Sequence, residues 1–192
     1  MKIKKVIINN AISIEEAEKS GIPRWKVASM CASGEIERIA RGIYAPHGYA
    51  SENGEIEILA RRGYNFVVAL ESALRFHGFA TTRALEVTVA LKRGARKPAV
   101  DFPLHVVRLG PASFEAGVEV HNVNGCNIKV FNAAKTVADL FMFRNKLGLD
   151  LAKEALYDGY TKRLFTIDEL TEYATIDRVT AAITPYIDAL FT

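Results

Sequence analysis

The stretch from Ile12 to Gly48 constrains the fold of this chain more than any other part of its sequence. Ser13 stands three residues before Glu16, which is the spacing of a capping box at the start of a helix. Gly21 is placed to end that helix in a left-handed conformation. Pro23 can open a second helix, because the first turn does not use the N–H that proline lacks. The spacing therefore predicts two helices joined by a tight turn.

The second predicted helix has two unlike faces. Val27, Met30 and Cys31 recur at i, i+3 and i+4, the spacing of a buried stripe. At about 100° per residue the opposite face carries small residues and one tryptophan, namely Trp25, Ala28, Ser29 and Ala32. Arg24 and Lys26 lie in the first turn, the part of a recognition helix that reaches base edges and phosphates. The small residues would let this helix lie close to a groove.

A short basic hairpin is expected directly after the second helix. Gly34 is a natural stop for the helix, and the alternation over residues 35–45 predicts two β segments joined around Ala40-Arg41-Gly42. Arg38 and Arg41 would then lie on or near the hairpin, where cations can meet phosphate. Helix, turn, helix and basic hairpin in this order indicate a winged helix-turn-helix DNA-binding domain. The alternative is a generic helix pair followed by a solvated hairpin.

The same stretch resembles the N-terminal winged-helix domain of AbiEi-type antitoxins. The matching positions are Gly21, Ile22, Val27, Met30, Gly34, Ile36, Arg38, Ile39, Arg41, Gly42 and Tyr44. The segments Leu70–Phe79 and Lys129–Phe141 are similar to later motifs of the family, so the resemblance covers roughly residues 12–143. This chain departs from the pattern at Pro23, where a capping serine is usual, at the bulky Trp25, and in the short segment MKIKKVIINN before the motif.

The resemblance implies a two-part protein. The winged helix would repress its own promoter, and the second domain would counter a nucleotidyltransferase-like toxin without needing a stable complex with it. Arg24, Lys26 and Ser29 are then expected to contact the groove, with Arg38 and Arg41 on the backbone or in the minor groove. Trp25 either reads DNA or packs against the N-terminal segment or the other domain. Since one such module reads few base pairs, two copies on an inverted repeat of double-stranded DNA are expected.

The rest of the chain is expected to form a mixed α/β second domain over residues 49–192, after a DNA-binding domain over residues 1–48. The pattern predicts helices near Ile56–Arg62 and from Leu70, strands at Glu86–Leu91 and Leu104–Leu109, and a hairpin turning at Asn124-Gly125. Asn132 can cap a further helix, and three helical stretches fill Leu149–Phe191. The fold class is therefore α+β, ending in helices.

A cationic loop lies between the two predicted strands. It reads KRGARKP and contains Lys92, Arg93, Arg96 and Lys97. These residues could form a second set of phosphate contacts on DNA. The alternative is a solvated connection between strands, and both interpretations stay open.

Composition agrees with a folded regulator. The 192 residues are 49% hydrophobic, which is enough for a real core. No apolar run approaches the roughly 20 residues of a membrane span, and the N-terminal segment lacks the features of a signal peptide. The two cysteines show no metal spacing, and we expect a reduced, cytoplasmic protein. Residues 1–49 carry 8 Lys/Arg against 5 Asp/Glu, whereas residues 110–192 carry 8 against 11.

No constellation of catalytic residues is evident, so we expect a protein that is not an enzyme and that binds no cofactor or metal. The four histidines lack ligand spacing, and no Glu-x-Lys triplet of a nuclease occurs. A second hypothesis keeps the winged helix but gives the second domain a ligand- or protein-sensing role without a toxin. The acidic C-terminal stretch with Tyr157, Tyr160, Tyr173 and Tyr186 is either a partner surface or a set of core-closing helices.

Overall fold

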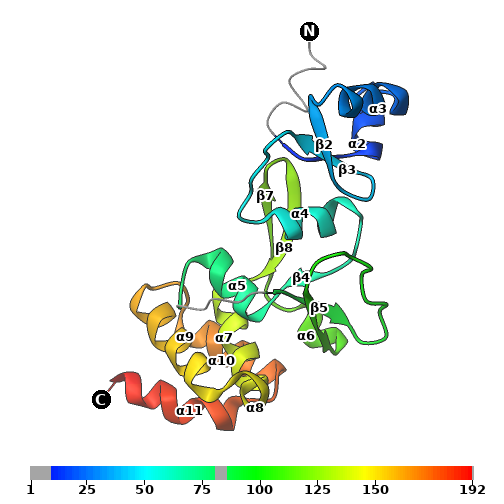
Figure 1. Cartoon of the computed structure of the whole chain (residues 1–192). Helices are drawn as coiled ribbons and strands as arrows, with labels where there is room; N and C mark the ends of the chain where they lie inside the picture. Colours follow the sequence, from blue (N-terminus) through cyan, green and yellow to red (C-terminus); the bar gives the residue numbers. More distant parts are fainter. Residues whose placement is uncertain (1–9, 81–85, 192) are drawn as a thin grey trace. The chain divides into compact units, whose positions relative to one another are not determined.

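The computed structural model describes residues 10–80 and 86–191 (Figure 1). Contacts group the chain into two compact units. The first comprises the residues up to Asn65 together with His121–Ile128, and the second comprises Phe66–Val120 together with the residues from Lys129 onward. These units rest on contacts, whereas the predicted boundary after Gly48 separates two domains that would fold independently. That boundary stays a prediction.

The first unit contains the predicted helix-turn-helix and hairpin. Its elements are β1 (Ile12–Ser13), α2 (Ile14–Lys19), α3 (Arg24–Ala32), β2 (Ile36–Ala40) and β3 (Ile43–Pro46). The three strands form an antiparallel sheet in the order β1-β3-β2. The pairing of β1 with β3 was not predicted, because a two-residue strand has no periodicity to detect. It attaches the start of α2 to the second strand of the hairpin.

Local chemistry at the ends of α2 agrees with the sequence. The Ser13 hydroxyl accepts a hydrogen bond from the Glu16 amide at 3.1 Å, and the Glu16 carboxylate accepts one from the Ser13 amide at 2.7 Å. This is the predicted capping box. Gly21 has a φ of +82°, so the turn needs the left-handed conformation that glycine adopts freely. Pro23 was predicted to be the first residue of the second helix. It is instead the N-cap, and α3 begins one residue later, at Arg24.

The small core of this unit lies under α2, α3 and the sheet. Val27 and Met30 are buried as the stripe predicted, whereas Cys31 is only half-buried. They pack with Ile12, Ala17, Ile22 and Ile36. Burying an aliphatic side chain of this size stabilises a fold by about 1.5–3 kcal/mol. This cluster therefore holds α3 against α2 and the sheet.

A polar network joins α4 (Gly54–Arg61) to the rest of the first unit. Glu57 is completely buried, and its carboxylate accepts hydrogen bonds from Tyr49, Ser51 and Asn124 at 2.6–2.9 Å. Arg61 donates to the Glu16 carboxylate at 2.8 Å and to the Asn124 carbonyl at 2.8 Å. The residues after Gly48 therefore form part of the same unit as α2.

The second unit opens with a mixed sheet. Its elements are β4 (Val67–Val68), α5 (Leu70–His77), β5 (Val87–Lys92), β6 (Leu104–Leu109), α6 (Pro111–Glu115), β7 (Val118–Val123) and β8 (Cys126–Phe131). The strand order is β6-β5-β4-β8-β7, with β5 parallel to β6 and β4 parallel to β8. The hairpin predicted at Asn124-Gly125 is present, and both turn residues have positive φ, 51° and 74°. Its tip, residues 121–128, is grouped with the first unit.

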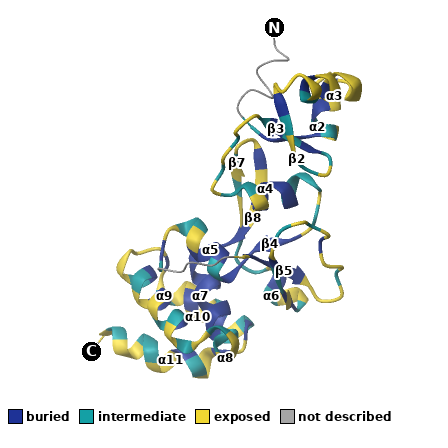
Figure 2. Ribbon diagram, in the orientation of Figure 1, coloured by how far each residue is buried: buried dark blue, intermediate teal, exposed yellow. Residues whose placement is uncertain are grey.

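Helices complete the second unit. They are α7 (Ala133–Met142), α8 (Arg144–Leu147), α9 (Leu149–Thr161), α10 (Ile167–Ile176), α11 (Thr180–Asp188) and the 3₁₀ turn η1 (Ala189–Phe191). α7 is almost entirely buried and packs against α5, α9 and α10 (Figure 2). Asn132 caps it, accepting from the Lys135 amide at 2.8 Å, as predicted. The predicted α+β fold class, with a mixed α/β region ending in helices, is confirmed.

The buried face of α7 carries an ionic cluster. Lys135 is fully buried and donates to the carboxylates of Asp139 and Asp177, the latter at 3.0 Å. Its ammonium also lies 4.7 Å from the centre of the Phe131 ring. Burial raises the pKa of the Asp139 carboxyl to about 7, although the neighbouring Lys135 acts to lower it. Along the described part of the chain, no helix is long and apolar enough to cross a membrane.

Candidate nucleic-acid interface

The outward face of α3 carries the predicted contact residues. Arg24, Trp25, Lys26 and Ser29 are all exposed, while Val27 and Met30 point into the core. Figure 2 shows this helix with an exposed surface over a buried edge. The helix therefore separates its residues into a packing face and a face free for a partner, as the sequence pattern predicts.

Arg24 is partly engaged by its own unit. Its Nε donates to the Glu18 carboxylate at 2.8 Å, and both side chains are well exposed. An exposed pair of this kind contributes little stability, because water and salt screen it. Arg24 can therefore exchange Glu18 for a phosphate at small cost. Sequence reasoning missed Glu18, since the six-residue spacing crosses the turn and no helix rule pairs the two positions.

Trp25 is 70% exposed, which is unusual for the largest aromatic side chain. The N-terminal segment against which it was alternatively expected to pack, residues 1–9, lies outside the described residues. An exposed indole on the helix face offers a flat apolar surface and one N–H donor. Such a group suits contact with sugar, thymine methyl groups or a partner protein.

The hairpin places two further cations at the surface. Arg38 lies on β2 and Arg41 in the turn, and both side chains are exposed. The Arg38 Nε donates to the Ala40 carbonyl at 3.4 Å, where the strand register shifts between these two residues. Gly42, with a φ of +76°, closes the turn. Its carbonyl accepts from the Ile14 amide at 2.9 Å, so the tip of the hairpin is fixed to the start of α2.

The cationic loop after β5 belongs to the second unit. Lys92, Arg93, Arg96 and Lys97 are exposed. Lys92 is paired with Glu115 of α6 at 3.0 Å, which neutralises one of the four charges. The Arg93 amide donates to the Leu109 carbonyl at 2.8 Å and continues the pairing of β5 with β6. The loop is thus ordered by backbone bonds while three of its cationic groups face solvent.

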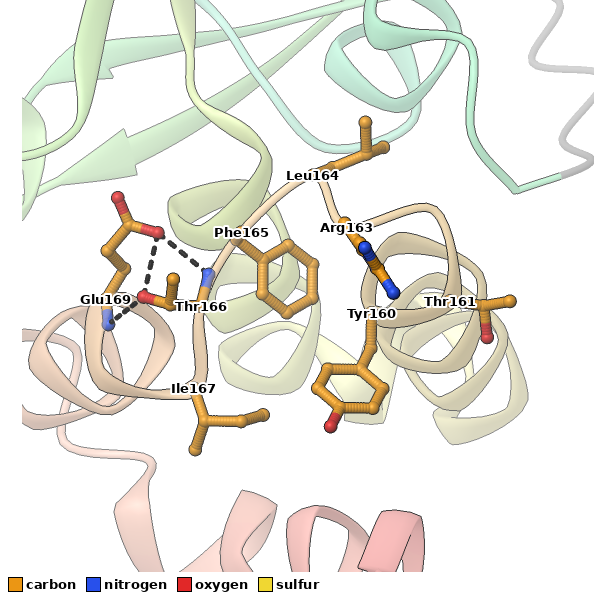
Figure 3. A pocket seen from close by; sticks show the side chains of 8 residues that line it. All are labelled: Tyr160, Thr161, Arg163, Leu164, Phe165, Thr166, Ile167 and Glu169. Atoms are coloured by element: carbon orange, nitrogen blue, oxygen red, sulfur yellow. Dashed lines mark hydrogen bonds between the residues drawn. The ribbon is translucent and has the colours of Figure 1, made fainter.

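Among residues 10–80 and 86–191, no three His, Cys, Asp or Glu side chains gather as a metal site would require. A hollow of about 740 Å³ lies where α9 ends and α10 begins (Figure 3). Its carboxylate, Glu169, accepts from the Thr166 amide at 2.8 Å and from the Thr166 hydroxyl at 3.0 Å. That carboxylate therefore completes the capping box at the start of α10.

Comparison with known proteins gives a match for the N-terminal part of the first unit. Residues 1–47 match a family model described as a transcriptional regulator, AbiEi antitoxin. The N-terminal region of this chain is therefore similar to that of AbiEi-type antitoxin regulators. The match contains every predicted contact residue of α3 and of the hairpin, whereas the Lys92 loop lies outside it. Because this family consists of transcriptional regulators, the match supports a DNA-binding regulator.

The chain as a whole is also similar in fold to a solved protein. The crystal structure of the RV2827C protein from Mycobacterium tuberculosis aligns with a TM-score of 0.56 and 13% sequence identity. The alignment covers 98% of this chain and 81% of that one. At such low identity the likeness concerns the fold alone. A comparison with curated proteins finds no match.

Proposed function

We propose that this chain is a cytoplasmic, sequence-specific autorepressor and the antitoxin of a type IV toxin–antitoxin system. The observation that carries the proposal is the exposed face of α3, which presents Arg24, Lys26 and Ser29 beside Trp25 within an AbiEi-type region. Arg38 and Arg41 of the hairpin would hold the phosphate backbone or the minor groove. The Lys92 loop would add phosphate contacts from the second unit.

The expected ligand is an inverted repeat in the chain's own promoter, bound by two copies. Each copy would place α3 in the major groove of one half-site, with half-sites about one helical turn or a multiple of it apart. The functional partner would be a nucleotidyltransferase-like toxin, opposed without a stable complex. The second candidate function is a regulator whose second unit senses a ligand, and a cationic hollow in that unit favours it.

DNA binding is tested by fluorescence anisotropy with the upstream promoter fragment at several salt concentrations. Arg24→Ala and Arg41→Ala should each weaken binding, and loss of one phosphate contact should lower the salt slope by about one. Arg163→Ala is the matched control, because Arg163 is an exposed arginine outside the proposed contacts. If both variants bind the promoter as tightly as the parent, the assigned face is wrong.

The antitoxin role needs a separate test. The neighbouring toxin reading frame is expressed under an inducible promoter, with this chain supplied from an independent promoter. Growth should be restored by the parent and also by Arg24→Ala, because repression is bypassed in this design. Failure of the parent to restore growth would favour the regulator without a toxin.

A further inference from the structure

A second hollow in the second unit has the composition of a ligand site. Its volume is about 500 Å³, within the range of small-molecule sites. It lies where the end of β6 leads into α6, beside the ends of α7 and α10. Its lining residues are Arg93, Arg108, Leu109, Gly110, Pro111, Ala112, Ser113, Met142, Phe143, Ile176, Asp177 and Arg178.

Three arginines give this hollow a positive charge. Arg93, Arg108 and Arg178 are exposed, and their guanidinium groups make no hydrogen bond or ion pair within the described part of the chain. Among the lining residues the carboxylate is Asp177, which already accepts from the Ser113 hydroxyl at 2.6 Å and from Lys135 at 3.0 Å. The arginines therefore remain available for an anion, and guanidinium groups bind phosphate in bidentate fashion.

The backbone at Arg178 is held in an unfavourable conformation. Its φ is +59°, in the left-handed region that glycine usually occupies at the end of a helix. The amide of Arg178 donates to the Thr175 carbonyl at 3.2 Å, and the Val179 amide donates to the Ala174 carbonyl at 2.8 Å. These two bonds form the Schellman motif that ends α10. Glycine would adopt this conformation with less strain, but the arginine present here places a cation at the hollow.

The remaining lining is apolar. Pro111, Met142, Phe143 and Ile176 provide it, with Phe143 as the aromatic ring. A neighbouring hollow of about 410 Å³ shares Arg108 and Phe143 and adds Lys146 and His105. An anion with a flat apolar part fits this combination better than a bare phosphate does, because the ring can bury against the apolar lining while the charge meets the arginines.

We propose that this hollow binds a nucleotide, with its phosphates on Arg108 and Arg178 and its base against the apolar lining. Arg93 would add a third contact to the phosphates. Ser113 also lines the hollow, and its hydroxyl is held in place by its hydrogen bond to the buried Asp177 carboxylate. The site includes none of the proposed DNA contacts of α3 and the hairpin, and it shares Arg93 with the loop proposed to add phosphate contacts. It would give the second unit a small-molecule effector.

Isothermal titration calorimetry on the full chain tests the proposal, with ATP and GTP as the probes. One of them should bind at one site per chain. Adenosine or guanosine, which lack the phosphates, and inorganic triphosphate, which lacks the base, should each bind about tenfold or more weakly. Absence of binding by both nucleotides at millimolar concentration overturns the site. Triphosphate binding as tightly as the nucleotide overturns its assignment to a nucleotide.

The matched variants are Arg178→Gly and Arg163→Gly. Arg163 ends α9 in the same motif with a φ of +56° but lines the hollow of Figure 3 instead. Both glycines relieve the left-handed backbone, so both variants should melt at or above the parent temperature. Only Arg178→Gly should weaken nucleotide binding, by about tenfold or more. Equal loss in both variants would contradict the site.

A third variant separates this proposal from DNA binding. Arg108→Gln should also weaken nucleotide binding about tenfold and leave promoter affinity within twofold of the parent. If Arg108→Gln and Arg178→Gly instead reduce promoter affinity while nucleotide binding is unchanged, these arginines serve the DNA interface and the nucleotide site is refuted.

Discussion

The exposed cations of α3 and the buried cation of α7 show two different uses of a positive charge. Lys26 on α3 is exposed and makes no ion pair or hydrogen bond through its side chain within the described residues. Lys135 on α7 is fully buried and bound to two carboxylates. A buried charge without a partner is very unfavourable, so Lys135 is fixed to the fold. An exposed charge is screened and exchangeable, which suits a residue that must meet DNA phosphates.

The largest effect is expected from removing the buried cation. Lys135→Ala leaves Asp139 and Asp177 buried without their partner, and the expected loss of unfolding free energy is about 3–5 kcal/mol. Urea denaturation measures it. Adding Asp139→Asn and Asp177→Asn to the Lys135→Ala variant should recover part of the loss, because the uncompensated charges disappear. A Lys135→Ala variant as stable as the parent would contradict the assignment of a buried ion pair to this cluster.

The cluster should also make stability depend on pH. The pKa of Asp139 is raised from 3.8 to about 7, so the folded chain keeps this proton where the unfolded chain has lost it. Its contribution is full below about pH 4 and is lost as the pH rises through about 7. Between pH 5 and pH 8 the parent should therefore lose about 2 kcal/mol more than Asp139→Asn does. Parallel urea denaturation profiles of the two proteins would contradict this assignment.

A smaller loss is expected in the first unit, where the polar network also couples buried groups. Asn124→Ala removes one of the three donors to Glu57 and places alanine at a φ of +51°. The unfolding free energy should fall by about 1–3 kcal/mol, since the buried Glu57 carboxylate loses a hydrogen bond and alanine is strained at a positive φ. Thermal unfolding followed by circular dichroism measures the change. Asn122→Ala is the control on the same hairpin, because the Asn122 side chain donates to Asn127 on the facing strand at 3.0 Å and is not part of the Glu57 network described above.

The local parts of this comparison could be predicted from sequence, whereas the tertiary parts could not. Ser13 with Glu16 and Asn124 with Gly125 act over a few residues, so spacing alone identifies the capping box and the turn. The stripe of α3 follows from helical period in the same way. Glu57 gave no such signal, because its partners lie as far away in sequence as Asn124.

The same limit applies to the candidate sites. The exposed residues of α3 and the hairpin follow from period and turn chemistry, and their arrangement is local. Arg93, Arg108 and Arg178 come from three separate segments, so only the packing of β5, β6 and α10 gathers them around one hollow. From the sequence, Lys135 is expected to be an ordinary helix residue. Its burial depends on Asp177, which lies far along the chain.

The smallest effect tests the exposed side of the comparison directly. Glu18→Gln removes the carboxylate that Arg24 contacts at 2.8 Å, and the unfolding free energy should change by no more than about 0.5 kcal/mol. Promoter affinity should rise about twofold or more at low salt, because Arg24 is released and a negative charge beside the DNA is lost. Glu15→Gln is the control, as Glu15 lies on α2 without a pairing to Arg24. Equal gains from both variants would indicate a general charge effect, whereas a gain confined to Glu18→Gln assigns it to the freed arginine.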